Sequence, residues 1–239
     1  MIPIVRGWLS GLVYTALLKR GAPLRTMGGA CAWAFVDAEL NERSIVYSGG
    51  VGHDISFEKE LVRTHRCSVW LFDPSVTGRR TMEEAANRVP RIHFLPVGLS
   101  GTSGDMGFRP PSEPGEGSFT LALPGRVGVR LPCRDLQSLM ADFGHDRIDL
   151  LKLDIEGFEY GVLEQVIGAR LDVRQICVEF HHQPAIAVGR WRKHRQVVEL
   201  LRHGYSLMSR RGNDFTFLVK GKAGRPFSPS GTAGSSPPP

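Results

Sequence analysis

Apolar runs and helical patterns alternate along this chain, and the alternation predicts an α/β fold. The runs are short and continuous, as is typical of parallel strands that are buried on both faces. Predicted strands span residues 44–48, 68–72, 91–97, 148–154 and 175–180. Segments with apolar residues at helical spacing predict helices at 54–66, 81–88, 134–143, 158–167 and 190–203. Connections of this length favour right-handed crossovers, so we expect one mostly parallel sheet with helices on both faces.

The segments outside this core predict a simple domain organisation. Residues 205–209 and 215–220 should close the sheet as an antiparallel pair, and 118–123 with 126–131 should form a hairpin. Residues 98–117 are rich in Gly, Pro and Ser and predict a long loop. We therefore expect an N-terminal helical extension at 1–40, with a second short helix near 30–40, one domain at 41–221, and a disordered Gly/Pro/Ser tail at 222–239.

The positive charge of the chain lies at its ends. The formal net charge is +6, yet residues 1–30 and 220–239 together contribute +7, which leaves the middle of the chain at −1. A basic groove for nucleic acid should belong to the folded part of the chain. Nucleic acid is therefore disfavoured as the main substrate, and a small molecule is expected. The basic segment 190–195 is interpreted as a solvated helix face.

The N-terminal apolar stretch is too short to span a bilayer, so no transmembrane segment is predicted. Packing of this stretch on the domain is favoured over weak contact with a membrane surface or a signal peptide.

The four cysteines have neither zinc-ligand nor redox spacing, and Cys67 and Cys177 are expected in the core. Reduced cysteines fit a cytoplasmic location, while secretion and the oligomeric state stay open.

Chemistry-bearing residues follow the predicted strands. Three glycines at 49, 50 and 52 form a turn that permits close approach of a ligand, and Asp73 ends the next strand. A glycine turn followed by such an acid indicates an adenosine-type cofactor. A dinucleotide-binding motif would have a third glycine at the start of the following helix, and this sequence has none there. Asp54 would also repel the two phosphates of a dinucleotide. This charge favours the amino group of S-adenosylmethionine over NAD, although an NAD-linked oxidoreductase or epimerase and a non-catalytic cofactor-binding domain remain alternatives.

Two segments resemble the FkbM-type S-adenosylmethionine-dependent methyltransferases. Residues 148–159, IDLLKLDIEGFE, are similar to the signature of that family, and residues 46–58 with Phe72-Asp73-Pro74 are similar to its cofactor region. The resemblance implies a Rossmann-like class I methyltransferase sheet of seven strands in the order 3-2-1-4-5-7-6, and methyl transfer to a hydroxyl. It also implies roles for the cofactor-binding residues. Gly49, Gly50, Gly52 and Asp54 would line the methionine end, Asp73 would hold the ribose, and Val97 with Gly98 would lie near the adenine.

The acceptor side is predicted from the ends of two other strands. Asp154, Glu179 and His181 are the candidate catalytic residues, and a hydroxyl acceptor needs its proton removed. Asp154 or His181 could act as a general base, or Asp154, Glu179 and His181 could bind a divalent metal that lowers the acceptor pKa. Beside them, Glu156 either takes part, caps the next helix, or pairs with Lys152 or an arginine, and His182 is a further candidate next to His181. Lys152 in its buried strand needs an ion-pair partner.

Overall fold

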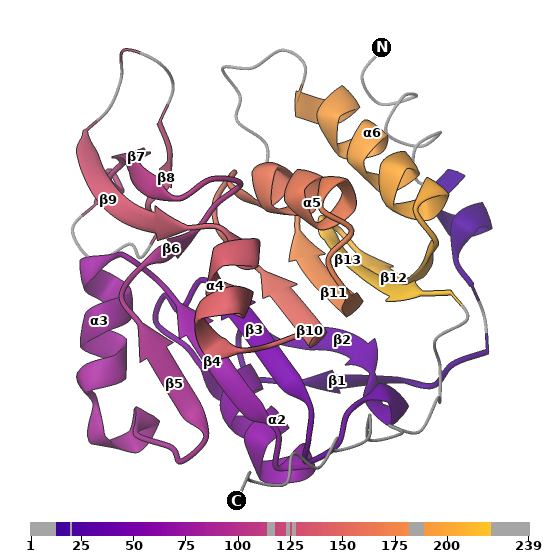
Figure 1. Cartoon of the computed structure of the whole chain (residues 1–239), viewed down its shortest axis with the longest axis horizontal. Helices are drawn as coiled ribbons and strands as arrows, with labels where there is room; N and C mark the ends of the chain where they lie inside the picture. Colours follow the sequence, from indigo (N-terminus) through magenta and orange to yellow (C-terminus); the bar gives the residue numbers. More distant parts are fainter. Residues whose placement is uncertain are drawn as a thin grey trace, which may run out of the picture.

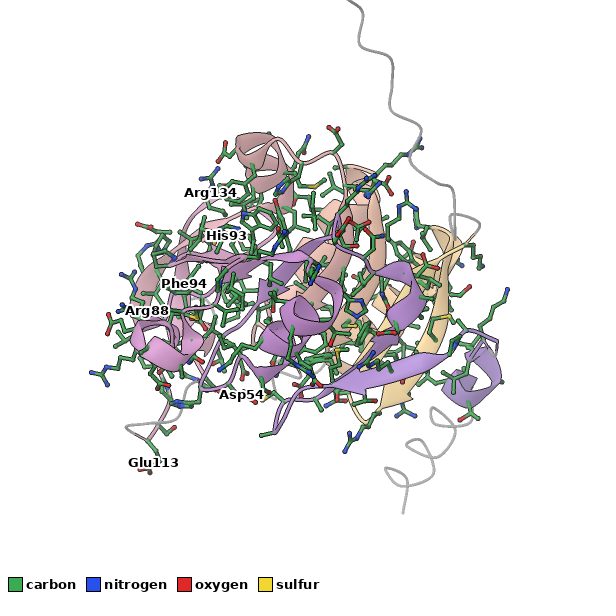
Figure 2. All side chains as sticks on the ribbon, turned by 90° about the horizontal axis from the view of Figure 1, so that it is seen from below. Asp54, Arg88, His93, Phe94, Glu113 and Arg134 are labelled. Carbon is green, nitrogen blue, oxygen red and sulfur yellow. The ribbon has the colours of Figure 1, made fainter. Side chains whose placement is uncertain are left out.

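The structure is a computed structural model that describes residues 13–19, 21–113, 118–122, 125, 128–181 and 189–220. A large mixed sheet forms its centre, with helices on both faces (Figure 1). Charged side chains such as Arg88 and Glu113 lie at the periphery (Figure 2). The tail predicted at 222–239 lies outside the described residues. Among the helices that are described, none has the length and apolar character needed to span a bilayer.

The central sheet has seven strands in the order β12-β13-β11-β10-β3-β4-β5. The strands are β3 (Ile45–Gly49), β4 (Ser68–Phe72), β5 (Ile92–Leu95), β10 (Ile148–Leu153), β11 (Val173–Glu179), β12 (Tyr205–Arg211) and β13 (Asp214–Val219). Strands β3, β4, β5, β10 and β11 are parallel, whereas β13 is antiparallel to both of its neighbours. Counted in chain order within this sheet, the strands run 3-2-1-4-5-7-6 from β5 to β12, which is the order that the resemblance implies.

Alternation along the strands divides the core into two layers. The helices are α2 (Ser56–His65), α3 (Val76–Glu83), α4 (Leu136–Phe143), α5 (Glu159–Gly168) and α6 (Gly189–Arg202). Tyr47 and Leu151 pack with residues of α4, α5 and α6 on one face of the sheet. Their neighbours Val46 and Leu150 point to the other face, where they pack with α2. Both faces of the parallel strands are therefore covered, as the continuous apolar runs predict.

The predicted helix at 30–40 is wrong, because the chain forms a hairpin there. Strand β1 (Leu24–Met27) pairs antiparallel with β2 (Trp33–Val36), and only a short 3-10 helix, η1 (Asp37–Glu39), follows. Trp33 and Phe35 are buried against the α2 face, and this period-two burial outweighs the helical pattern. Earlier in the chain, residues 13–17 are helical and pack on the domain, with Tyr14 only 3% exposed.

The predicted loop at 98–117 is wrong as well, since much of it belongs to a second sheet. Strands β6 (Gly98–Leu99), β7 (Gly104–Arg109), β8 (Thr120–Leu121) and β9 (Val129–Arg134) pair in the order β6-β9-β7-β8, and we call them the accessory sheet. The predicted hairpin therefore has the wrong pairing, because β8 and β9 both pair with β7 rather than with each other. In the sequence, glycines and prolines around Phe108 interrupt the apolar pattern that would predict a strand, although β7 buries Phe108. The helix predicted at 81–88 begins earlier, at Val76, because Ser75 caps it by accepting a hydrogen bond from Gly78 N.

The Asp135 carboxylate links the accessory sheet to helices of the domain. Asp135 caps α4 by accepting a hydrogen bond from Ser138 N at 2.9 Å, and it also accepts from Gln165 Nε2 of α5 at 2.9 Å. Ser103, between β6 and β7, donates a short hydrogen bond to the same carboxylate. Burial would raise the pKa of Asp135, but the hydrogen bonds from Ser103, Ser138 and Gln165 outweigh it and lower the pKa.

We expect Asp135→Asn to lower the free energy of unfolding at pH 7 by about 1–2 kcal/mol, because an amide accepts fewer of these bonds. A depressed pKa stabilises the fold above the pKa of the unfolded chain, near 4, and that stability is lost as the pH falls towards the lower folded value. Urea unfolding between pH 7 and pH 3 should therefore show the variant and the wild type converging at low pH. Asp142→Asn, which removes an exposed ion pair with Arg134, is the control and should change little. A deficit of Asp135→Asn that stays constant with pH would contradict this assignment.

Candidate active site

A cavity of about 340 Å³ lies at the carboxyl ends of β3, β4 and β10. This is the edge of an open α/β sheet where ligands bind, and the volume lies in the range of small-molecule sites. The glycine turn after β3, the end of β4 and the end of β10 form its walls. The turn between β1 and β2 and the accessory sheet complete the enclosure.

The glycine turn and the end of β10 touch each other. Gly50 has φ +86°, and a Cβ atom at this position would lie 1.9 Å from the backbone oxygen of Asp154. Lys152 Nζ bridges the two strand ends by donating a hydrogen bond to Gly50 O at 2.8 Å. Glycine is therefore required at position 50, both for its backbone conformation and for the missing side chain.

Asp73 fixes the shape of the glycine turn. One carboxylate oxygen accepts hydrogen bonds from Val51 N at 2.9 Å and Gly52 N at 3.2 Å, and the other accepts from Ser75 N at 2.8 Å. A Cβ atom on Gly78 would lie 2.5 Å from Asp73 Cγ, so the start of α3 can approach the carboxylate only because residue 78 is glycine. Asp73 also lines the cavity. Its contact with a ribose stays a prediction.

Asp54 joins α2 to the β1–β2 turn at the cavity wall. It accepts hydrogen bonds from Ser56 N at 2.7 Å, Ser56 Oγ at 2.8 Å and Cys31 N at 3.5 Å. Burial would raise the pKa of Asp54, but these hydrogen bonds and Lys59 lower it. The carboxylate is therefore charged at neutral pH where a cationic amine is expected.

The predicted cofactor residues separate into two groups. Five of them line the cavity, namely Gly50, Gly52, Asp54, Asp73 and Gly98. Gly49 and Val97 are not among the described residues that line it. A Cβ atom on Gly49 would lie 2.9 Å from Ile155 Cγ2 and 3.0 Å from Leu99 Cδ1, so Gly49 serves packing at the end of β3.

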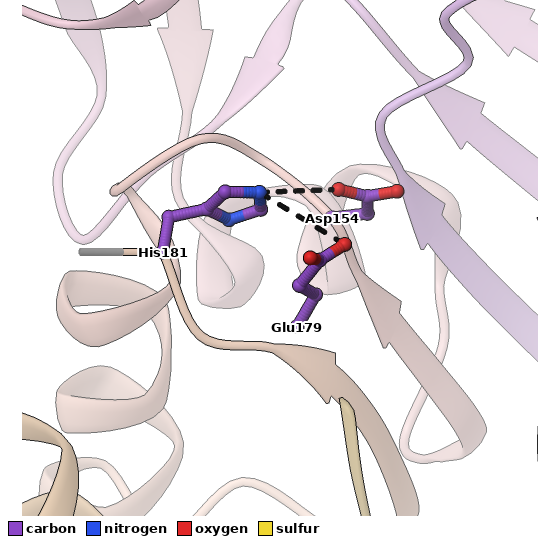
Figure 3. Close-up of side chains that lie close together, drawn as sticks. All are labelled: Asp154, Glu179 and His181. Carbon is purple, nitrogen blue, oxygen red and sulfur yellow. Dashed lines mark ion pairs between the residues drawn. The ribbon is translucent and has the colours of Figure 1, made fainter. Parts of the chain in front are cut away.

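The three candidate catalytic side chains converge, although they come from the ends of two strands (Figure 3). His181 Nε2 lies 3.7 Å from Asp154 Oδ1 and 3.9 Å from Glu179 Oε2. One donor atom from each residue falls within 4.8 Å of the others, so the group could hold a metal ion. Asp154 lines the cavity, whereas Glu179 and His181 are not among its described lining residues. His182 lies outside the described residues.

A buried acid, Glu159, positions His181. Glu159 is 0% exposed and accepts hydrogen bonds from His181 N at 2.7 Å and from Gly157 N at 2.8 Å. Burial of His181 would lower its pKa, but the carboxylates of Glu159, Glu156 and Glu179 outweigh burial and raise the pKa to about 9. His181 is therefore protonated at neutral pH in the protein without a bound metal.

Glu156 does not cap α5, because the N-cap residue is Phe158 and no side chain accepts a hydrogen bond there. Glu156 has φ +52°, lines the cavity, and places Oε2 3.6 Å from His181 Nε2. Left-handed backbone at a residue other than glycine is costly and concentrates at functional sites. Lys152 finds the partner it was expected to need, because its Nζ lies 3.8 Å from Asp154 Oδ2.

Several cavity residues were not predicted from the sequence. Phe108 and Phe119 come from the accessory sheet region, and the Phe108 ring stacks on Phe158 with centroids 4.7 Å apart. Cys31 enters from the β1–β2 turn, and Lys152 lines the wall rather than serving only as an ion pair. The sequence carries one signal for this aromatic wall, namely the large Phe158 directly after Gly157 at the end of the predicted strand.

Two glycine substitutions separate close approach from backbone conformation. Gly50 and Gly52 both have positive φ, but a Cβ atom on Gly52 meets nothing within 4 Å. Gly52→Ala should cost about 1–2 kcal/mol of unfolding free energy for left-handed strain alone. Gly50→Ala adds a collision with the Asp154 backbone, so we expect a loss of roughly 3 kcal/mol or more in urea unfolding. Equal losses in the two variants would contradict the contact between the strand ends.

Comparison with known proteins places this geometry in a family. Residues 38–207 match the methyltransferase FkbM domain. The probable methyltransferase-like protein 24 of Homo sapiens is 28% identical over 155 residues, which are 62% of this chain and 36% of that protein. The hexuronic acid methyltransferase AglP of Haloferax volcanii is 27% identical over 127 residues, which are 50% of this chain and 52% of that protein. The chain thus spans about a third to a half of the length of these two curated relatives.

Among solved structures, the fibrillarin pre-rRNA processing protein of Methanococcus jannaschii is 12% identical and superposes with a TM-score of 0.47, covering 84% of this chain and 72% of that one. The family match spans well over half of the residues, including the glycine turn, Asp73 and the whole of the Asp154 strand end. The chain therefore belongs to the FkbM methyltransferase domain family.

Proposed function

We propose that this protein transfers the methyl group of S-adenosylmethionine to a hydroxyl of a small acceptor. The observation that carries the proposal is the contact between Gly50 and Asp154, which brings the cofactor turn and an acceptor-side carboxylate to one cavity. Catalysis of methyl transfer depends chiefly on alignment, because the acceptor oxygen must lie in line with the methyl group. A rigid contact between the two binding elements provides such alignment.

The cavity offers groups suited to each part of this cofactor. The Asp54 carboxylate matches the amino group, and the shaped turn at Gly50–Gly52 leaves room for the methionine chain. Asp73 faces the cavity with hydrogen-bonding capacity left for ribose hydroxyls, since a carboxylate has about four acceptor sites and three are used. S-adenosylmethionine, when bound, supplies an activated methyl group on a positively charged sulfur.

Asp154 is the residue that we propose accepts the proton of the acceptor hydroxyl. It is the one candidate of the three that is found among the described lining residues. The protonated His181 places Nε2 3.7 Å from Asp154 Oδ1, and Glu179 lies 3.9 Å from the same ring nitrogen. The proton would pass from the hydroxyl to the Asp154 carboxylate as the oxygen forms its bond to the methyl carbon, and the bond between that carbon and the sulfur would break, so that the donor leaves as neutral S-adenosylhomocysteine.

The acceptor class follows from the surroundings of Asp154. Phe108, Phe119 and Phe158 provide apolar ring faces, and Asp154 and Glu156 provide acceptors for hydroxyl groups. Sugar rings present both an apolar face and hydroxyls, and the archaeal relative is named as a hexuronic acid methyltransferase. We therefore propose a sugar or a similarly hydroxylated small molecule. The NAD-linked alternative is disfavoured by the charged Asp54 at the glycine turn.

A second candidate mechanism uses a divalent cation at Asp154, Glu179 and His181, because their donor atoms lie within 4.8 Å of one another. The two carboxylates suit Mn²⁺, and a bound cation would lower the pKa of the acceptor hydroxyl. Prolonged dialysis against a chelator should then abolish methyl transfer, and added Mn²⁺ should restore it. Calorimetry should show Mn²⁺ binding to the wild type and weaker binding to Glu179→Gln. Full activity after chelation would exclude the mechanism with a divalent cation and leave the mechanism in which Asp154 acts as a general base.

We expect Asp154→Asn to lower kcat for methyl transfer by about 10²–10⁴-fold, because an amide cannot accept the proton. Affinity for S-adenosylmethionine should change little, since the close contact with Gly50 is made by the Asp154 backbone. The assay follows label from the methyl donor into a fractionated cell extract and into a panel of sugars. Glu164→Gln, an exposed acid on α5, is the matched control. Undiminished transfer by Asp154→Asn would refute the proposed role.

A further inference from the structure

The exposed face of α6 has an arrangement that the methyltransferase site does not explain. Trp191, Arg195, Val198 and Arg202 follow one another at helical spacing and lie on one stripe of the helix, which we call the α6 stripe. All four are exposed, and Trp191 is 74% exposed. Tryptophan is highly buried on average in folded proteins, so an indole exposed to this degree on a helix is unusual.

Exposed apolar side chains are found on α6 and on the helical turn beside it. The described chain has six large hydrophobic residues that are exposed, and four of them are Val13, Leu17, Trp191 and Val198. The helical turn that carries Val13 and Leu17 lies beside α6, because the Tyr14 ring stacks on His194 with centroids 5.3 Å apart. Each of these two neighbouring helices therefore carries exposed apolar side chains.

The charge of α6 is strongly positive. The helix carries five Arg and Lys residues and one acid, Glu199. Arg195 has no ion pair with any residue in the described ranges. Arg192 covers the Tyr160 ring at 4.4 Å, and Tyr160 in turn donates to His181 O, so the Trp191 end of α6 adjoins the acceptor side of the site.

We propose that the α6 stripe docks the protein on an anionic membrane surface. Trp prefers the interface between headgroups and acyl chains, and arginines on the same helix face attract anionic lipids. The aliphatic Val13, Leu17 and Val198 favour a bilayer over a nucleic acid, which would engage the arginines but not these side chains. Docking in this orientation would bring the acceptor side of the cavity towards the bilayer.

Vesicle flotation of the full chain tests the proposal without any activity measurement. Vesicles of phosphatidylcholine alone should bind weakly, and vesicles with a quarter of phosphatidylglycerol should bind tightly at low salt and release the protein at high salt. Arg195→Glu/Arg202→Glu should weaken binding by roughly thirty-fold or more, because each basic residue near the surface contributes about a factor of five. Trp191→Ala should weaken it by about ten-fold, through loss of the buried indole.

The matched control is Arg43→Glu/Arg63→Glu, which makes the same charge change at exposed positions before β3 and on α2. It should bind vesicles within about two-fold of the wild type. All variants change exposed residues, and equal thermal midpoints would confirm that each is folded. Three outcomes would overturn the proposal: no binding to anionic vesicles, equal binding by the α6 and control variants, or binding only to an RNA oligonucleotide or an acidic protein.

Discussion

The close contact between the ends of β3 and β10 is the constraint on which the site depends. At Gly50 the backbone comes so near to the Asp154 carbonyl that no side chain fits, and Lys152 holds the two ends together from within the sheet. Lys152 is 5% exposed, and a buried ammonium group needs partners, which the Gly50 oxygen and the Asp154 carboxylate provide. The glycine turn and the Asp154 carboxylate are thus parts of one rigid element.

Buried acids extend this rigidity outward from the contact. Asp73 fixes the glycine turn through two backbone N–H groups and accepts a third hydrogen bond from Ser75 N, and Glu159 fixes the turn after β10 together with the end of β11. Asp135 fastens the accessory sheet, which brings Phe108 to the cavity. In each case a carboxylate accepts several hydrogen bonds, which offsets the cost of its burial. The geometry of the candidate site is therefore determined largely by carboxylates that hold its backbone in place.

The core strands of this fold can be predicted well, because the residues of each run already favour a buried strand. Contacts with distant parts of the chain change this prediction little. The runs at 68–72 and 148–153 are mostly apolar and mostly buried, as is typical of parallel strands that are covered on both faces. The accessory sheet and the N-terminal hairpin could not be predicted in the same way. Strand β7 contains two glycines, and β2 is a strand because Trp33 and Phe35 bury against α2. Their conformations depend on tertiary contacts rather than on local pattern.

The same distinction holds for the site. Asp54, Asp73 and Asp154 are predictable because strand ends of a parallel sheet meet at one edge. Glu159 and Gly78 are not, because their importance lies in what they touch: His181 N and Gly157 N for the glutamate, and the Asp73 carboxylate for the glycine. The aromatic wall of Phe108 and Phe158 likewise requires the accessory sheet to be in place.

Calorimetric titration with S-adenosylmethionine tests the central claim most directly. The account predicts binding in the micromolar range, at about −8 kcal/mol, no measurable binding of NAD, and at least a ten-fold loss of affinity in Asp73→Ala. Absence of S-adenosylmethionine binding at millimolar concentration, or equal affinity in Asp73→Ala, would contradict it.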